Sequence, residues 1–189
     1  VGVLIPYRFY KNYGDKRLLE KYFDCIIRYA NFMIKRCGRA KGIYSIYAKP
    51  LHLSKENRKY GVNTGQSYGE WAEPADVKPY VWTDFCMPHP EESMAYTSWI
   101  LGIVEEICDI LGKPEYKPVI HEYSIGVKKA YQELVTKDAF SLDTDRQARL
   151  VRPLYFDLLD EKDTAFAPCA SYGFSGTKTL MNNVTSTIL

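Results

Sequence analysis

"PYRFYKNYGDKRLLEKYFDCIIRYANFM" occupies residues 6–33 and predicts two helices joined by a tight turn. Gly14 suits the left-handed position that follows many helices, and Asp15 suits the N-cap of the next helix, where a carboxylate accepts a free backbone N–H. From Lys16 to Cys37, apolar residues recur every three or four positions, which is the spacing of one helical face. That face comprises Leu19, Tyr22, Phe23, Ile26, Ala30, Met33, Ile34 and Cys37. The stretch therefore predicts a helical hairpin.

The helical spacing returns further along the chain. It predicts helices at residues 90–111, 117–135 and 143–159, and a short one after the glycine-rich turn at residues 173–177. Asp143 or Asp145 is expected to cap the third of these, and Phe23 and Trp99 are expected to be buried without contacting a ligand. The predicted apolar faces also include Tyr96 on the first of the three helices, Val119 on the second, and Val151 and Tyr155 on the third. Glu91 lies in the first turn of the first helix, where the helix dipole favours an acid. No segment alternates as a strand does. Short turns alternate with longer loops, so the sequence predicts an all-α fold of helical hairpins with the functional loops on one rim.

The composition excludes several classes of function. The 189 residues suffice for one domain with a substantial core, and their net charge of +2 gives no basic field that would attract nucleic acid. No apolar run reaches the roughly 18 residues of a membrane span. Five cysteines without a CxxC pair or a histidine at ligand spacing predict free thiols in a reducing compartment and no metal site. We therefore expect a cytoplasmic protein with no metal, nucleic acid or membrane as partner.

The irregular stretch between residues 39 and 90 contains SYGEWAEP, residues 67–74. So long a connection is usually functional or disordered, and its many aromatic residues argue against disorder. Glu70 and Trp71 present a carboxylate beside a flat apolar ring. Such a pair suits a sugar, whose hydroxyls donate to the acid while its C–H face lies on the ring. The alternative is a lid, in which Trp71 plugs the end of the helical core and Glu70 caps a helix or pairs with a lysine.

YGFSGT, residues 172–177, is a second candidate site. Two glycines flank Phe174 and Ser175 and precede Thr177, which predicts a tight turn at a helix N-terminus, where backbone N–H groups can bind an anion or a hydroxyl. The alternative is a plain helix entry capped by Thr177. Catalytic residues cannot be selected from the sequence, because no histidine lies near the local serines and the many carboxylates of residues 70–92 single out no pair.

Five segments resemble one family of enzymes, in the right order along nearly the whole chain. The hairpin of residues 6–33 resembles the helix–YGD–helix hairpin of the inverting α-L-rhamnosidases, and SYGEWAEP is similar to their YGDWL-type loop. ESMAYTSWILGIVEEICDILGK (92–113) is similar to the helix that follows. DTDRQARLVRPLYFDLLDEK (143–162) is similar to the T-Q…L-P-L-Y-F-G-L helix, and YGFSGTKTLMNN (172–183) resembles GFxGTPxLL. Each segment alone is weak, but together they make the resemblance specific.

The resemblance implies an (α/α)6 toroid that hydrolyses terminal α-L-rhamnosides by a single displacement. One carboxylic acid would protonate the leaving oxygen, and a carboxylate would activate water, without a cofactor. It also implies that Glu70, Trp71 and Phe174 contact the carbohydrate. Glu70 and Trp71 are expected to face the central cavity on the rim of long loops, with Phe174 close by.

The chain also departs from the family. The family's general-acid segment precedes the position of Val1 and its general-base segment follows that of Leu189. We therefore expect the chain to be an incomplete toroid, the middle of a single catalytic domain, completed by the remainder of its polypeptide and inactive alone. Glu70 replaces the usual Asp, Lys178 replaces a Pro, and helix is missing near residues 167–172. Two rivals stay open: a non-catalytic helical carbohydrate-binding or scaffold domain, and another (α/α)6 glycosidase.

Overall fold

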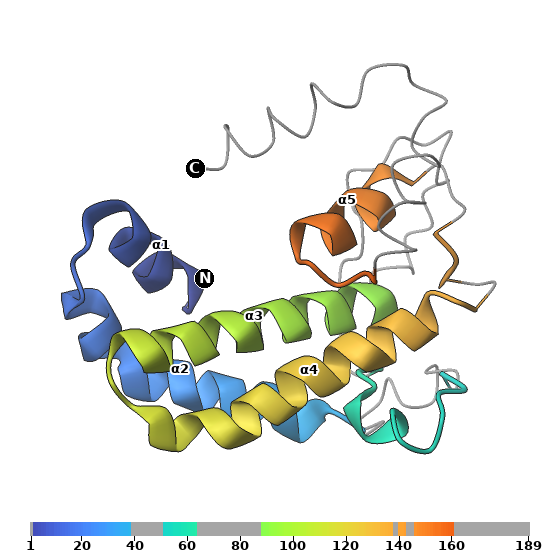
Figure 1. Cartoon of the computed structure of the whole chain (residues 1–189), viewed down its shortest axis with the longest axis horizontal. Coiled ribbons are helices and arrows are strands. Elements are labelled where there is room, and N and C mark those ends of the chain that lie inside the picture. Colours follow the sequence, from blue (N-terminus) through green and yellow to red (C-terminus); the bar gives the residue numbers. More distant parts are fainter. Residues whose placement is uncertain (1, 39–50, 64–87, 138–139, 143–145, 161–189) are drawn as a thin grey trace.

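A computed structural model describes residues 2–38, 51–63, 88–137, 140–142 and 146–160 of the chain (Figure 1). All regular structure within these ranges is helical. The elements are α1 Leu4–Tyr13, α2 Arg17–Arg36, η2 Arg58–Tyr60, α3 Pro90–Ile110, η4 Pro114–Tyr116, α4 Lys117–Leu134 and α5 Gln147–Tyr155. The prediction of an all-α fold built from helical hairpins is confirmed.

The first hairpin, α1–α2, turns where the sequence predicts. Gly14 has φ 68°, in the left-handed region, and its N–H donates to the Tyr10 carbonyl oxygen at 2.8 Å. The expected N-cap is one residue early, because Lys16 occupies the N-cap position of α2, without a capping hydrogen bond from its side chain. Asp15 nevertheless stabilises the start of α2, because its Oδ1 accepts a hydrogen bond from the backbone N–H of Arg17 at 2.9 Å. The carboxylate therefore satisfies an N–H that the first helical turn leaves without a partner.

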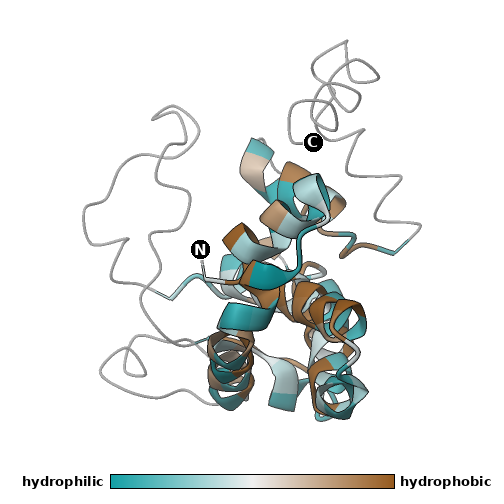
Figure 2. Ribbon diagram, turned by 90° about the vertical axis from the view of Figure 1, so that its left-hand side faces the viewer, coloured by the Kyte–Doolittle hydropathy of each residue, from teal (hydrophilic) through white to brown (hydrophobic). Residues whose placement is uncertain are grey.

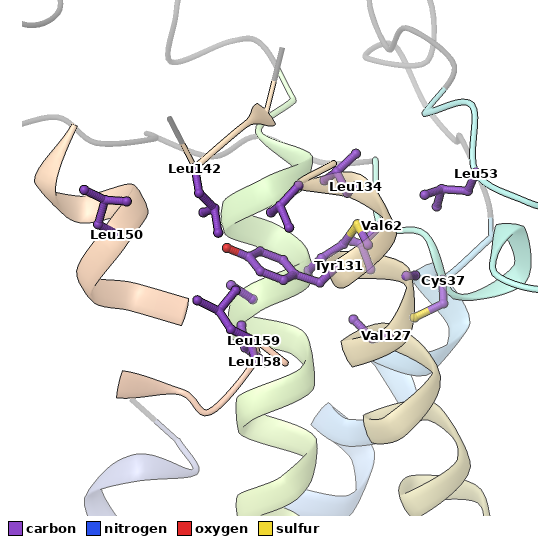
Figure 3. Packing of buried hydrophobic residues seen from close by; sticks show 14 residues of the cluster. Cys37, Leu53, Val62, Val127, Tyr131, Leu134, Leu142, Leu150, Leu158 and Leu159 are labelled. Atoms are coloured by element: carbon purple, nitrogen blue, oxygen red, sulfur yellow. The ribbon is translucent and has the colours of Figure 1, made fainter. Parts of the chain in front are cut away.

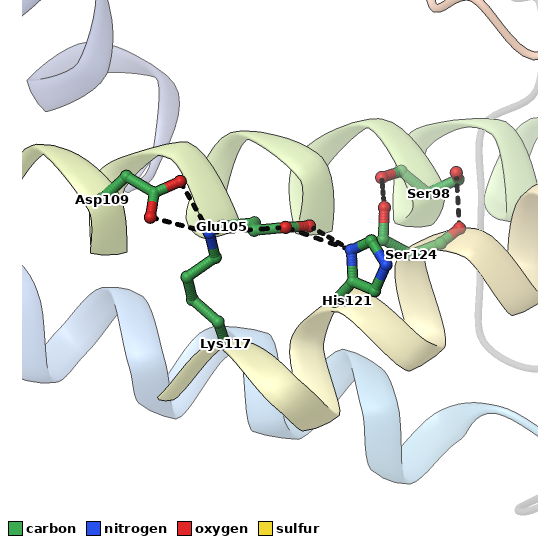
Figure 4. A network of polar contacts seen from close by, with 6 residues as sticks. All are labelled: Ser98, Glu105, Asp109, Lys117, His121 and Ser124. Atoms are coloured by element: carbon green, nitrogen blue, oxygen red, sulfur yellow. Dashed lines mark hydrogen bonds and ion pairs between the residues drawn. The ribbon is translucent and has the colours of Figure 1, made fainter. Parts of the chain in front are cut away.

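α3 is the central helix of the described structure. It lies alongside α4 as the second hairpin, with α2 packed against the pair and α1 and α5 on the other side (Figure 1). Ser98 and Ser124 bring α3 and α4 close together, because each hydroxyl donates to the other residue's carbonyl oxygen, at 3.0 and 3.2 Å (Figure 4). Their small side chains permit this close approach.

The core consists of two apolar clusters, and the apolar faces of the helices turn toward one another (Figure 2). One cluster joins α2 to α3 through residues such as Leu19, Phe23 and Ile107. The other surrounds Tyr131 and Leu134 of α4 (Figure 3). The predicted buried face of α2 is confirmed except for Tyr22, which is exposed, and Ile34, which is partly buried.

Several predicted core positions are wrong or only partly right. Tyr96 on α3, Val119 on α4, and Val151 and Tyr155 on α5 are exposed, so the phase inferred for the start of α4 and for α5 is rotated from the true one. Trp99 is only partly buried. For Trp99 the cause is that α3 buries residues on several of its sides. The periodicity of the sequence alone does not show which side is buried most completely.

Short turns and long connections occupy opposite ends of the described helices. Lys16 Nζ donates to the Ile110 carbonyl oxygen at 2.9 Å, which places the α1–α2 turn beside the end of α3. At the other end, the N–H of Gly38 donates to the carbonyl oxygen of Gly61 at 2.8 Å and joins the end of α2 to residues 51–63. The expectation of a wholly irregular stretch from 39 to 90 is wrong for this part, which forms η2 and packs on α4.

Candidate functional site

The three sequence-predicted contact residues lie outside the described residues. Glu70 and Trp71 belong to residues 64–87, and Phe174 belongs to residues 161–189. The caps at Asp143 or Asp145 lie outside them as well. Their placement thus remains a prediction. The structure does describe residues 51–63, which precede residues 64–87, and the start of α3, which follows them.

Residues 51–63 are held on α4 by hydrogen bonds to one carboxylate, that of Glu133. Glu133 Oε1 accepts the backbone N–H of Ser54 at 2.7 Å, and Oε2 accepts the Ser54 hydroxyl at 2.9 Å and the Asn57 amide at 2.7 Å. Burial disfavours the charge, but the hydrogen bonds from Asn57 and Ser54 outweigh it and lower the pKa of Glu133. Tyr60 packs directly on Gly126, where any Cβ would collide with the ring. The chain therefore enters residues 64–87 from a rigid base.

The helix start that follows carries a buried charge pair. Arg152 of α5 donates from Nη1 to both carboxylate oxygens of Glu91, in the first turn of α3, at 2.9 Å. Tyr131 of α4 donates its hydroxyl to Glu91 Oε1 at 3.2 Å, and Figure 3 shows that hydroxyl at the end of the ring nearest α5. Glu91 and Arg152 are each only 7% exposed. Three helices are thus joined through one carboxylate.

Burial acts against both charges of this pair. It raises the pKa of the Glu91 carboxyl, with Arg149 and the Tyr131 hydrogen bond opposing the shift, and it lowers the pKa of the Arg152 guanidinium. Burial and the Glu91 charge also raise the pKa of Tyr131. Each charge is costly to bury alone and is tolerated because the other faces it. Glu91 is therefore a structural carboxylate, since both of its oxygens accept hydrogen bonds and the residue is almost fully buried.

An aromatic surface adjoins the charge pair, and we define it as Tyr96, Trp99, Tyr155 and Phe156. The rings of Trp99 and Phe156 stack with centroids 4.2 Å apart and an interplanar angle of 8°. Tyr96 meets Phe156 edge to face at 5.1 Å, and its ring lies 5.9 Å from the Arg152 guanidinium. Tyr96 is 43% and Tyr155 38% exposed. The surface thus combines exposed ring area with phenolic hydroxyls.

α1 borders the aromatic surface. Arg8 Nη2 donates to the Tyr155 hydroxyl oxygen at 2.8 Å and joins α1 to α5. Next to it, Tyr7 donates its hydroxyl to Glu106 of α3 at 2.6 Å, and burial together with that carboxylate raises the pKa of Tyr7. Arg8 of α1 and Tyr155 of α5 therefore lie on the same side of α3, the helix that carries Trp99 (Figure 1). Flat rings bordered by hydrogen-bonding groups can hold the C–H face and the hydroxyls of a sugar.

Sequence reasoning missed the buried role of Glu91 and Arg152. The sequence predicts Glu91 only as an acid favoured by the helix dipole, and it assigns no role to Arg152. The sequence holds no local signal for this role, because α5 carries two arginines, Arg149 and Arg152, and nothing in the helix itself distinguishes them. The partner itself could not be found, because Glu91 and Arg152 lie 61 residues apart in sequence.

The described residues contain no group of three or more His, Cys, Asp or Glu side chains that could hold a metal ion. Within the same ranges, no helix has the length and apolar character needed to cross a membrane. A second polar network on α3 and α4 links Glu105 and Asp109 to Lys117 and His121 (Figure 4). Glu105 and Lys117 are partly buried, whereas Asp109 and His121 are exposed, and the network links the two helices.

Comparison with known proteins identifies the family. No curated protein and no solved structure matches the chain significantly. The sequence model of one family, described as the bacterial alpha-L-rhamnosidase 6 hairpin glycosidase domain, matches residues 1–180. The helical hairpins α1–α2 and α3–α4 agree with that description. The chain therefore belongs to the six-hairpin glycosidase domain family of the bacterial α-L-rhamnosidases.

Proposed function

We propose that the chain forms one wall of the substrate pocket in an enzyme that hydrolyses terminal α-L-rhamnosides with inversion at the anomeric carbon. The observation that carries the proposal is the family match over residues 1–180. A glycosidase domain implies a carbohydrate substrate. The aromatic surface between α1, α3 and α5 supports the proposal, because exposed rings beside hydroxyl groups suit a sugar.

In this proposal the chain supplies substrate contacts, and the acid–base pair comes from other parts of the polypeptide. Glu91, a buried acid beside the aromatic surface, is only 7% exposed and accepts hydrogen bonds from Arg152 and Tyr131. Glu70 accepts hydrogen bonds from hydroxyl groups of the sugar, while Trp71 and Phe174 cover its methyl group and C–H face. The reaction needs no metal or cofactor, and the five cysteines remain reduced in the cytoplasm.

Substitutions in SYGEWAEP test the proposal in the complete enzyme. Trp71→Ala is expected to lower kcat/KM on an aryl α-L-rhamnoside while leaving the melting temperature near that of the parent. Glu70→Gln keeps the shape and removes the charge. It should cost roughly 1.5–3 kcal/mol of transition-state binding, because a hydrogen bond to a charged acceptor is lost.

Glu56→Gln is the matched control. Glu56 is an exposed glutamate in the fixed segment 51–63, and neutralising it should leave kcat/KM unchanged. A lower melting temperature with unchanged kinetics for Trp71→Ala and Glu70→Gln would favour the lid alternative. Binding of L-rhamnose without any hydrolysis by the complete protein would favour the non-catalytic carbohydrate-binding domain.

A further inference from the structure

α2 carries a second row of large side chains on its solvent side, in addition to its buried face. Tyr22, Tyr29 and Phe32 are 41%, 48% and 53% exposed, and Cys25 is exposed between them. We name these four residues the α2 stripe. Their spacing alternates three and four residues, which is the a/d spacing of a helix–helix seam. The rings of Tyr29 and Phe32 stack with centroids 6.4 Å apart.

A helix at the surface of a globular protein ordinarily buries a single apolar face. α2 already does so, because Leu19, Phe23 and Ile26 pack into the core. A further exposed row of aromatic residues at seam spacing marks a surface that another element covers. Single exposed apolar residues would need no such explanation, but four at regular spacing on one helix do.

The α2 stripe has a basic flank. Lys21, Arg28 and Lys35 follow one another at seven-residue spacing, so they form a single row along one side of the stripe, and all three are exposed. Lys21 also lies over the Tyr22 ring at 5.5 Å, and Arg36 over the Phe32 ring at 5.6 Å. Charges that flank a helical seam select its partner by sign. The row therefore favours a partner helix with an acidic flank.

The same row argues against a second copy of the chain as the occupant. When two α2 helices pair antiparallel through their stripes, the row of Lys21, Arg28 and Lys35 meets its own copy. Like charges brought together in this way repel. A different helix, with glutamates or aspartates along the facing edge, avoids that repulsion.

The family supplies the source of such a helix. Its domain has six hairpins, whereas the described residues form two, α1–α2 and α3–α4, and the further helix α5. The hairpin α3–α4 covers the buried face of α2 and leaves the α2 stripe open. We propose that the α2 stripe is the docking face for a helix of a neighbouring hairpin in the six-hairpin domain, with apolar residues at heptad spacing and an acidic flank against Lys21, Arg28 and Lys35.

The reactivity of the Cys25 thiol measures whether this contact forms, because Cys25 lies within the α2 stripe and a docked helix would cover it. The experiment measures the rate at which a maleimide labels Cys25 in the complete polypeptide that the gene encodes, with peptide mass spectrometry as the readout. We expect labelling at least about tenfold slower than in the same protein unfolded in denaturant. Labelling as fast as in the unfolded protein would overturn the proposal.

Two charge-reversal variants separate the possible occupants. Lys35→Glu should speed the labelling of Cys25, because it sets a like charge against the acidic flank, whereas the matched reversal Lys129→Glu at an exposed position of α4 should not. Equal labelling in the two variants would refute the acidic partner. Protection of Cys25 that disappears on dilution would identify a second copy as the occupant and would likewise overturn the proposal. The readout does not depend on hydrolysis, so its failure is distinct from a failure of the proposed function.

Discussion

Arg152→Met is expected to destabilise the chain by roughly 3–5 kcal/mol, since the substitution leaves Glu91 buried without its cation. Arg152 Nη1 donates to both Glu91 oxygens at 2.9 Å, and the two side chains are 6% and 10% exposed. Tyr131 would remain as a donor and Arg149 as a nearby positive charge, but neither replaces the two hydrogen bonds that Arg152 donates to the Glu91 carboxylate. Urea unfolding followed by circular dichroism measures the loss.

A double-mutant cycle distinguishes a coupled pair from two separate contributions. Glu91→Met together with Arg152→Met should recover most of the loss, because an apolar pair of similar volume no longer buries charge. Lys128→Met is the control. Lys128 pairs with the exposed Asp157 at 3.0 Å, so its removal should change stability by at most roughly 1 kcal/mol. Additive single-variant losses, or a loss below about 1 kcal/mol for Arg152→Met, would contradict the account.

Phe23→Ala is expected to cost roughly 3–5 kcal/mol of unfolding free energy, because it removes a large side chain from the core between α2 and α3. Phe23 is buried, its ring meets Tyr116 edge to face at 5.2 Å, and Lys113 Nζ lies 4.3 Å from its centroid. Urea unfolding of the 189-residue chain measures the effect.

Phe32→Ala in the same 189-residue chain is the control of matched residue type on the same helix. Phe32 is half exposed there, so its truncation should change stability by about 0.5 kcal/mol or less. Equal losses for Phe23→Ala and Phe32→Ala would show that the helical phase of α2 is wrong.

The first hairpin could be predicted from the sequence because its signals are local. A glycine at a left-handed position and a regular apolar face lie within a few residues of each other, and the structure confirms Gly14 and the burial of Leu19 and Phe23. α3 was harder, because a central helix is covered on several sides and loses the clear period of a surface helix. Trp99 was accordingly expected in the core and is only partly buried.

The candidate site could be predicted only in part, for two reasons. The pair Glu91–Arg152 depends on a contact between distant segments, and no local pattern identifies a buried arginine. Tyr155 was assigned to the buried face of α5, yet it is exposed and contributes to the aromatic surface. The roles of Glu70, Trp71 and Phe174 rest on the chemistry of their side chains and on the family resemblance, and they stay predictions.

Hydrolysis of an aryl α-L-rhamnoside by the complete polypeptide, followed by proton NMR from the first turnovers, tests the central claim most directly. A single displacement by water inverts the anomeric carbon, so the account predicts that β-L-rhamnose appears first and the α-anomer only later by mutarotation. The 189-residue chain alone should give no turnover above the uncatalysed rate. First release of α-L-rhamnose, or no hydrolysis by the complete polypeptide, would contradict the account.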